Sequence, residues 1–273
     1  MSIGYASLTV GVPQTDLKSC ILKNANEANL LQLISHNLRS LARMIDYNEK
    51  NNIMLFRISS SLIPFGSSPA NKLPWWTIFS SQFQKIGAKI CNSKMRVSLH
   101  PGQYTVLNSP NEEIVARAMA DLQYHNQVLT SLGVGPAHKI VLHIGGVYQD
   151  KQQASKRFIA NYQHLDQAIK ERLVLENDDK LYNIEDVLEI ATAVNAPVIF
   201  DNLHHAVNPD KHKKNDSYWI HACRKTWQKK DGKQKIHYSQ QNQLKKTGSH
   251  SASIKVSEFM DFYDSVSGNN LDI

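Results

Sequence analysis

The chain has 273 residues, of which 41% are hydrophobic, so it can bury a large core in one domain the size of an α/β barrel. Lysine and arginine outnumber aspartate and glutamate by 31 to 24, and the net charge of +7 favours a polyanionic partner such as nucleic acid. No apolar run approaches the roughly 18 residues of a membrane span, which argues against a membrane protein. The three cysteines are widely spaced and show no zinc-type pattern, so we predict reduced thiols and a cytoplasmic protein.

Short apolar segments rich in β-formers alternate with longer segments of helical periodicity along the chain. The expected strands are Ile3–Ala6, Ile53–Ile58, Met95–Leu99, Lys139–Ile144, Leu173–Glu176, Pro197–Phe200 and Lys235–Tyr238. The expected helices are Asn24–Lys50, Trp75–Ile90, Asn111–Leu132, Ser155–Arg172, Asn183–Val194 and Lys255–Val266. This alternation predicts βα units around a parallel sheet.

Seven expected strands, and the start of an eighth in the terminal sequence NLDI, predict an α/β fold of the (β/α)8 TIM-barrel type. We expect one TIM-barrel domain over residues 1–273, truncated before the end of strand 8 and helix 8. A long basic loop is expected at about 208–232. From Lys211 to Lys246 there are ten lysines and one arginine against two aspartates, which fits either a solvated surface or a phosphate-contacting face.

Residues that can bind a metal lie at or near the carboxyl ends of five expected strands, where a parallel barrel has its active site. These residues are His100, His143, Glu176, Asp201 and His237. His204 follows shortly after Asp201, and His250 precedes the last expected helix. A lone histidine at a strand end is more often a hydrogen-bonded structural residue, but five strands ending in this way indicate a common site.

Imidazole nitrogens and carboxylate oxygens are the ligands of zinc, manganese or iron. Because the candidates exceed what one ion needs, we predict a divalent metal cluster of two or three ions, with Glu176 as a bridging ligand. Lys235 lies two residues before His237, so both side chains point to the same face of the strand. An ammonium group facing metal ions would be repelled, so Lys235 is either turned away from them or modified to an acid.

Several motifs of the chain resemble, in order and spacing, those of the UV damage endonucleases, which are related in fold to endonuclease IV. The motifs are YASLTV, LFRISSSLIPF, SLHPGQYTVLNSP, VLHIGG, RLVLENDDK, FDNLHH, KIHYS and SHS. The resemblance extends from the N-terminus to Ile273, and HPGQYTVLNSP together with LENDDK is its most specific part.

The resemblance implies a metal-dependent endonuclease that cuts the phosphodiester immediately 5′ to cyclobutane pyrimidine dimers and (6-4) photoproducts and leaves a 3′-hydroxyl. It implies manganese and double-stranded UV-damaged DNA as the substrate. We expect zinc or magnesium as alternative metals, and a monomer that is nucleoid-associated if bacterial. The implied metal ligands are His100, His143, Glu176, Asp201, His204, His237 and His250. The implied catalytic residues are Glu176, Lys235 and His237, with Lys235 at the position of a lysine that can be carboxylated. The implied DNA-binding residues are Tyr5, Gln103 and Tyr104.

The chain departs from the family pattern at three places. The family has a further glutamate ligand on the eighth strand, which this sequence does not contain. Ser68 stands where many members carry histidine, and the family asparagine near the first strand has no clear counterpart around Ser7–Thr9. The sequence leaves three alternatives open: an abasic-site endonuclease, a xylose isomerase-like sugar isomerase, and a non-catalytic DNA-binding barrel.

Overall fold

The computed structural model describes residues 1–273, and the chain divides into two compact units. The N-terminal unit comprises Ser2–Thr105 and Ala116–Ile140, and the C-terminal unit comprises Met1, Val106–Val115 and Val141–Ile273. The strands follow one another in the order β1 to β7, which is the chain order.

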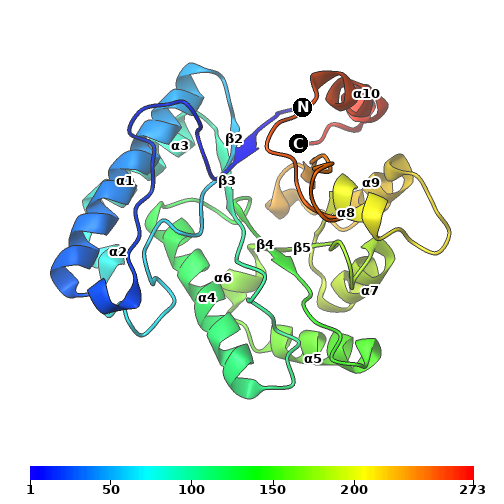
Figure 1. The fold of residues 1–273 in the computed structure, drawn as a ribbon, viewed down its shortest axis with the longest axis horizontal. Coiled ribbons are helices and arrows are strands. Elements are labelled where there is room, and N and C mark those ends of the chain that lie inside the picture. The colour runs from blue at the N-terminus through cyan, green and yellow to red at the C-terminus, as the bar shows by residue number, and fades with distance from the viewer. The chain divides into compact units, whose positions relative to one another are not determined.

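The N-terminal unit contains parallel strands alternating with helices (Figure 1). Its strands are β1 (Tyr5–Ala6), β2 (Leu55–Arg57), β3 (Arg96–Leu99) and the first residues of β4 (Lys139–His143). Its helices are η1 (Leu22–Asn24), α1 (Glu27–Lys50), α2 (Trp75–Ile78), α3 (Ser80–Asn92) and most of α4 (Glu112–Ser131). Phe56 is paired with Tyr5 on one side and Val97 on the other, in parallel register. Helices α1 and α3 lie side by side and bury apolar faces that include Ile34 and Ile86.

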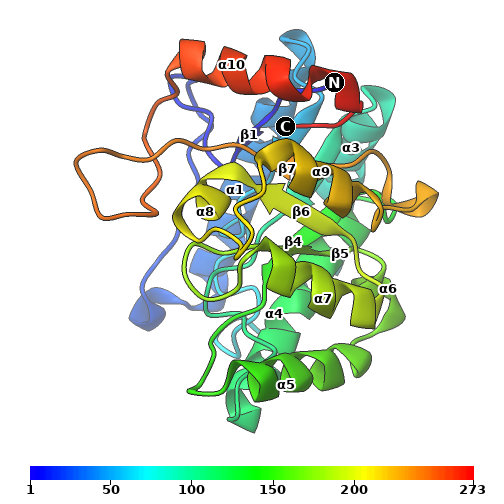
Figure 2. The same cartoon turned by 90° about the vertical axis from the view of Figure 1, so that its right-hand side faces the viewer.

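The C-terminal unit continues the same alternation (Figure 2). Its strands are β5 (Leu173–Glu176), β6 (Val198–Asp201) and β7 (Ile236–His237), together with the end of β4. Its helices are α5 (Lys151–Gln163), α6 (Gln167–Lys170), α7 (Ile184–Val194), α8 (Asn202–Val207), α9 (Asp216–Arg224), η2 (Lys229–Asp231), α10 (Val256–Val266) and η3 (Ser267–Asn269). Helices α7 and α9 pack on β6. Val141, Val174 and Ile199 form a buried core cluster, against which Trp227 packs.

The helix boundaries follow local capping. Asn183 and Asp186 form a capping box at the start of α7, in which each side chain accepts a hydrogen bond from the other residue's backbone N–H. The side chain of Asp150 accepts from the backbone of Gln153, so α5 begins at Lys151 rather than at the expected Ser155.

Three expected elements differ from the structure. The helix expected at Trp75–Ile90 is two helices, α2 and α3, separated at Phe79, and the one expected at Ser155–Arg172 is divided between α5 and α6. The prediction of a long basic loop at about 208–232 is wrong, because helix α9 lies within this segment. Asn215 caps α9 by accepting from the backbone of Tyr218, and Trp219, Ile220 and Cys223 form its buried face.

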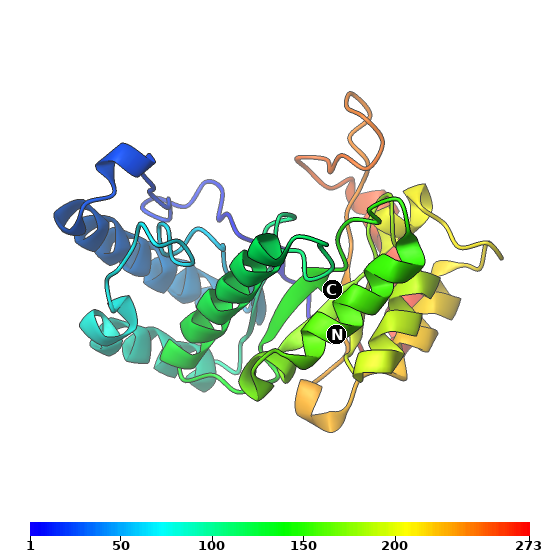
Figure 3. The same ribbon diagram turned by 90° about the horizontal axis from the view of Figure 1, so that it is seen from below.

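The last residues of the chain pair in parallel with the segment that leads into β7. Ile236 donates its N–H to the carbonyl of Asp272 at 2.9 Å, and Asp272 donates to Gln234 at 2.8 Å. The expected entry into an eighth strand is therefore present. The segment between β7 and α10, coloured orange in Figures 2 and 3, extends away from the helices of the C-terminal unit.

No helix of the chain is both long enough and apolar enough to cross a membrane.

Candidate metal centre

Glu176, Asp201 and His237 lie at the carboxyl ends of three adjacent strands of the C-terminal unit. Strand β6 pairs in parallel with both β5 and β7, and in this register Asp201 is directly opposite His237. Parallel strands end at the same edge of a sheet, so their terminal side chains converge. One ligand atom from each of the three residues lies within 4.8 Å of the other two, a spacing at which all three could hold one metal ion.

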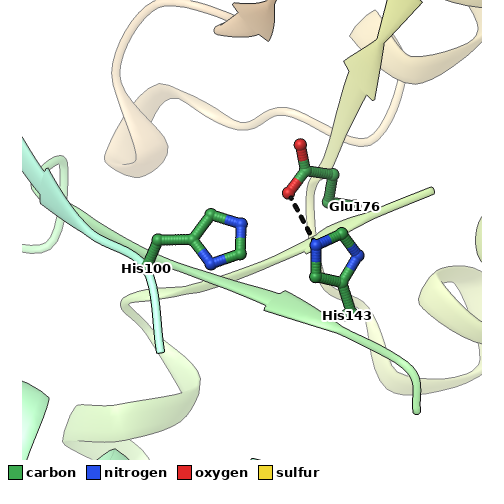
Figure 4. A group of neighbouring side chains, drawn as sticks. All are labelled: His100, His143 and Glu176. Atoms are coloured by element: carbon green, nitrogen blue, oxygen red, sulfur yellow. Dashed lines mark ion pairs between the residues drawn. The ribbon is translucent and has the colours of Figure 1, made fainter. Parts of the chain in front are cut away.

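The Glu176 carboxylate lies between two imidazoles. Its Oε1 is hydrogen-bonded to Nδ1 of His237, and its Oε2 lies 3.4 Å from Nε2 of His143. The dashed line in Figure 4 marks the pair formed by Glu176 and His143. Only 1% of Glu176 is exposed, and a buried carboxylate is costly unless positive or donating groups face it. Because each of its two oxygens faces a different potential ligand, Glu176 has the arrangement that a bridging carboxylate requires.

Asn177 fixes the position of Asp201. Its side-chain amide donates to the Asp201 carbonyl at 3.1 Å, and its side-chain oxygen accepts from the Asp201 backbone N–H at 2.9 Å. Asp201 itself is 3% exposed, and its Oδ1 accepts from the backbone N–H of His204, which makes it the N-cap of α8. A strand end held in this way cannot shift without breaking buried hydrogen bonds.

His204 presents its Nε2 atom as a potential ligand. Its Nδ1 lies 2.8 Å from the Asn177 carbonyl oxygen, which can only accept, so Nδ1 carries the proton and Nε2 the lone pair. Burial acts to lower the pKa of His204, but the nearby carboxylates of Asp201 and Glu176 outweigh it, and the pKa is raised. The negative field that favours a protonated imidazole here also favours a bound cation.

The other predicted residues of the C-terminal unit have mixed environments. The His204 ring lies 5.5 Å from the His143 ring and 5.7 Å from the ring of His250, which is exposed on the segment between β7 and α10. Lys235 is 3% exposed and forms a parallel bridge with Asp272 immediately before β7.

The remaining predicted residues lie in the N-terminal unit. His100 follows β3, with its Nδ1 3.0 Å from the Pro101 carbonyl oxygen. Gln103 and Tyr104 are exposed on the loop that follows, Tyr104 by 71%. The Tyr5 hydroxyl is 2.7 Å from both Thr9 Oγ1 and Asn48 Oδ1, so protein groups already engage it.

The donor set of the C-terminal unit fits a divalent metal. Two carboxylates and three imidazoles converge, and they combine the oxygen and nitrogen ligands typical of zinc, manganese and iron sites. The set consists of His143, Glu176, Asp201, His204 and His237.

Two residues that support the centre were missed by the sequence reasoning, Asn177 and Asn202. Asn202 donates its side-chain amide to the Ser239 carbonyl at 3.1 Å and accepts from the Ser239 N–H at 2.8 Å. Each asparagine therefore joins the end of its own strand to the end of the next strand. The available signal was an asparagine directly after a strand-terminal carboxylate, in LEN and in FDN.

A family model described as UV-endonuclease UvdE matches residues 4–271 of the chain. The chain belongs to the UV-endonuclease UvdE family. This membership confirms the resemblance found in the motifs. A UV DNA damage endonuclease from Clostridium perfringens (strain 13 / Type A) is 41% identical over 278 residues, which cover 100% of this chain and 66% of that protein. The chain thus spans just under two thirds of the length of that UvdE relative.

Solved structures support the same family and fold. The crystal structure of SacUVDE is 35% identical and matches with a TM-score of 0.94, covering 100% of this chain and 91% of that one. Endonuclease IV from Thermus thermophilus is 13% identical with a TM-score of 0.52, covering 83% of this chain and 72% of that one, and this likeness shows the fold alone. The predicted fold class, an α/β fold of the TIM-barrel type, is confirmed.

Proposed function

We propose that the chain is a metal-dependent DNA repair endonuclease that hydrolyses the phosphodiester immediately 5′ to UV photoproducts and leaves a 3′-hydroxyl. Membership of the UvdE family supports the substrate class. The observation that carries the proposal is the buried Glu176 carboxylate with one oxygen facing His143 and the other facing His237. Nucleases that displace a phosphoryl oxygen in line use such bridged sites to hold neighbouring metal ions.

A bound cluster of two or three divalent ions, manganese by resemblance, would polarise the scissile phosphate and provide hydroxide at neutral pH. The chain's own residues hold and orient such a cluster. Glu176 would bridge the ions, Asp201 and the imidazoles of His143, His204 and His237 would be further ligands, and Asn177 holds the Asp201 backbone in register. We also assign His100 and His250 as ligands, following the family motifs.

Lys235 is assigned a catalytic role through carboxylation. The assignment follows the family motif, and Lys235 lies two residues before His237, so both side chains point to the same face of the strand. Intact-mass measurement of the protein in bicarbonate buffer, compared with a Lys235→Ala variant, tests the assignment. A gain corresponding to one carboxyl group is expected in the unsubstituted protein only.

Recognition of damage is assigned to the exposed loop after β3. A crosslinked pyrimidine pair stacks and pairs poorly, so separating it from the duplex costs less than for undamaged bases. Tyr104 would then stack in the space left and Gln103 would hydrogen-bond there, while lysines and arginines hold the backbone without reading sequence. Tyr5 would contact the lesion through its ring, since its hydroxyl is engaged by Thr9 and Asn48.

The direct test incubates the chain with supercoiled plasmid that is UV-irradiated, depurinated or untreated, in manganese with and without a chelator. We expect nicking of the irradiated plasmid only, abolished by the chelator, with ends that a polymerase extends directly. Preferential nicking of the depurinated plasmid would favour an abasic-site endonuclease instead. Absence of nicking from every plasmid, with metal bound, would contradict a nuclease and leave sugar isomerisation to be assayed.

A further inference from the structure

A buried hydrogen-bond network in the N-terminal unit connects helix α4 to both ends of the loop that carries Gln103 and Tyr104. The loop begins after His100 and ends at Thr105, and its tip is exposed. Thr105 is 2% exposed, so an exposed tip is followed directly by a buried residue.

The first end of the loop is held through Ser60. The Ser60 hydroxyl donates to the carbonyl oxygen of His100 at 2.7 Å and lies 2.9 Å from Nε2 of His125 on α4. His125 is 0% exposed, and its Nδ1 lies 2.6 Å from the carbonyl oxygen of Asp121. Tyr124, the neighbour of His125, donates its hydroxyl to the Ser60 carbonyl at 2.9 Å. Two adjacent side chains of α4 therefore hold Ser60 in place.

The second end of the loop is held by Asp121. The Thr105 hydroxyl donates to Asp121 Oδ2 at 2.6 Å, and this oxygen also lies 3.6 Å from Nδ1 of His125. Asp121 and His125 are four residues apart on α4, so their side chains lie on one face of the helix. One turn of α4 therefore fixes the residue before the loop and the residue after it.

The tip between these ends is a tight turn. Thr105 donates its N–H to the Gly102 carbonyl at 2.9 Å. A Cβ atom at position 102 would lie 2.3 Å from Cε1 of Tyr104, so the tyrosine ring packs against the glycine backbone. The direction of the Tyr104 ring is thus set by the turn, and the turn is set by its two anchored ends.

We propose that Asp121 and His125 are positioning residues that pre-organise the Gln103–Tyr104 tip for contact with damaged duplex DNA. The inference rests on the proposed function, because it assigns the tip a role in recognition. Its physical basis is that a loop ordered by buried hydrogen bonds loses its conformational entropy during folding and not during DNA binding. Neither residue touches the DNA in this account.

The test compares Thr105→Val, which removes the donor to Asp121 while keeping the shape of the side chain, with Thr105→Ser, which keeps the donor. We expect Thr105→Val to lower the ratio of affinities for UV-irradiated over undamaged duplex by about tenfold, the scale of one hydrogen bond to a charged group. Affinity for undamaged duplex should be unchanged, and Thr105→Ser should retain the wild-type ratio. Amide hydrogen exchange over residues 101–105 should accelerate in Thr105→Val alone.

A second pair of variants tests the other end of the loop and covers the case in which Thr105→Val does not fold. Ser60→Ala removes the link to His100 and His125, while its neighbour Ser59 accepts only a local bond from the Ser61 backbone, so Ser59→Ala is the matched control. Faster loop exchange in Ser60→Ala with an unchanged affinity ratio would overturn the inference, as would unchanged exchange in both anchor variants. A wild-type protein with no preference for irradiated duplex would instead overturn the proposed function, so the two failures are distinguishable.

Discussion

The Asp121–His125 network and the candidate metal centre both combine histidine and carboxylate side chains, and they differ in how their hydrogen bonds are completed. In the Asp121–His125 network of the N-terminal unit, both ring nitrogens of His125 lie within hydrogen-bond distance of protein groups, and Asp121 accepts from Thr105. In the candidate metal centre of the C-terminal unit, Glu176 and Asp201 face three imidazoles, and the lone pair of His204 Nε2 remains available as a ligand.

The direction of the pKa shifts follows this difference. Burial lowers the pKa of His125, although Asp121 acts to raise it. The pKa of His204 is raised, because Asp201 and Glu176 outweigh burial. The same residue types thus build a hydrogen-bonded scaffold in one region and an anionic site that favours a cation in the other.

The largest expected effect comes from Glu176→Gln, which tests whether the anionic character of the centre matters. Removing the charge from the bridging residue should abolish metal-dependent incision. Loss of a residue that only supports a metal ligand typically lowers metal affinity or activity about 10–100-fold, so loss of a direct ligand should lower incision by at least about 100-fold. Incision of irradiated plasmid is the measurement. Glu189→Gln, on an exposed position of α7, is the control and should behave as wild type. Normal cutting by Glu176→Gln would exclude Glu176 as the bridging ligand.

Asn177→Ala tests the support of the centre rather than its ligands. It removes two buried hydrogen bonds to the Asp201 backbone, which should cost about 2 kcal/mol of unfolding free energy and weaken metal binding about tenfold. Urea denaturation and metal titration measure the two effects. Asn161→Ala removes a comparable bond to the Leu107 carbonyl and should destabilise the chain without weakening metal binding. Equal metal affinities in both variants would leave Asn177 a purely structural residue.

The Asp121–His125 network should show its own pH dependence. The pKa of His125 is lower in the folded chain than the ordinary value of 6.5, so its contribution to stability is fully present above about pH 6.5 and is lost as the pH falls through the folded pKa. Each unit of lowering corresponds to about 1.4 kcal/mol. The free energy of unfolding is measured with urea for the wild type and for His125→Gln, each at pH 7.5 and at pH 5.5. The stability that the wild type loses between the two pH values, minus the stability that the variant loses, gives the contribution of His125. Parallel losses in the two proteins would show that His125 is not the titrating group.

The smallest effect is expected at the basic turn before α9. Lys211, Lys213 and Lys214 are exposed there, and the turn is held by Asp210, which accepts from the backbone N–H groups of His212 and Lys214. If these lysines contact phosphates, changing all three to glutamine should make DNA binding less dependent on salt. The slope of the logarithm of the binding constant against the logarithm of the salt concentration should fall by up to about three, with little effect on the preference for damaged DNA.

The control for the basic turn removes the same charge elsewhere. Lys23, Lys50 and Lys94 are exposed in the N-terminal unit, and changing them to glutamine should leave the salt slope unchanged. Equal slopes for both triple variants would assign the basic turn to a solvated surface.

The sequence predicted the strand ends well, because hydrophobic periodicity and residue composition can be read from each short segment by itself. Leu173–Glu176 was predicted with its observed bounds, and the ligand candidates of the C-terminal unit other than His250 lie at or near strand ends, as expected. The break at Phe79 and the short helix α8 were missed. Both depend on capping and packing, and Asp201 caps α8 although the sequence indicated it only as a ligand.

The supporting contacts could not be predicted, because they join residues far apart in the sequence. Ser60 and His125 are 65 positions apart, and nothing in the periodicity of α4 distinguishes Asp121 or His125 from other buried polar residues. Asn177 was visible as part of LEND, but its reciprocal bonds to Asp201 require the register of β5 and β6.

The central claim is that the C-terminal unit binds divalent metal. Inductively coupled plasma mass spectrometry of the purified chain, after dialysis against manganese, tests it most directly. We expect bound metal in the wild type and in His125→Gln, and loss of most of it in Glu176→Gln, because only the C-terminal region is an anionic ligand set. Metal-free wild-type protein, or a Glu176→Gln variant that retains the full metal content, would contradict the account.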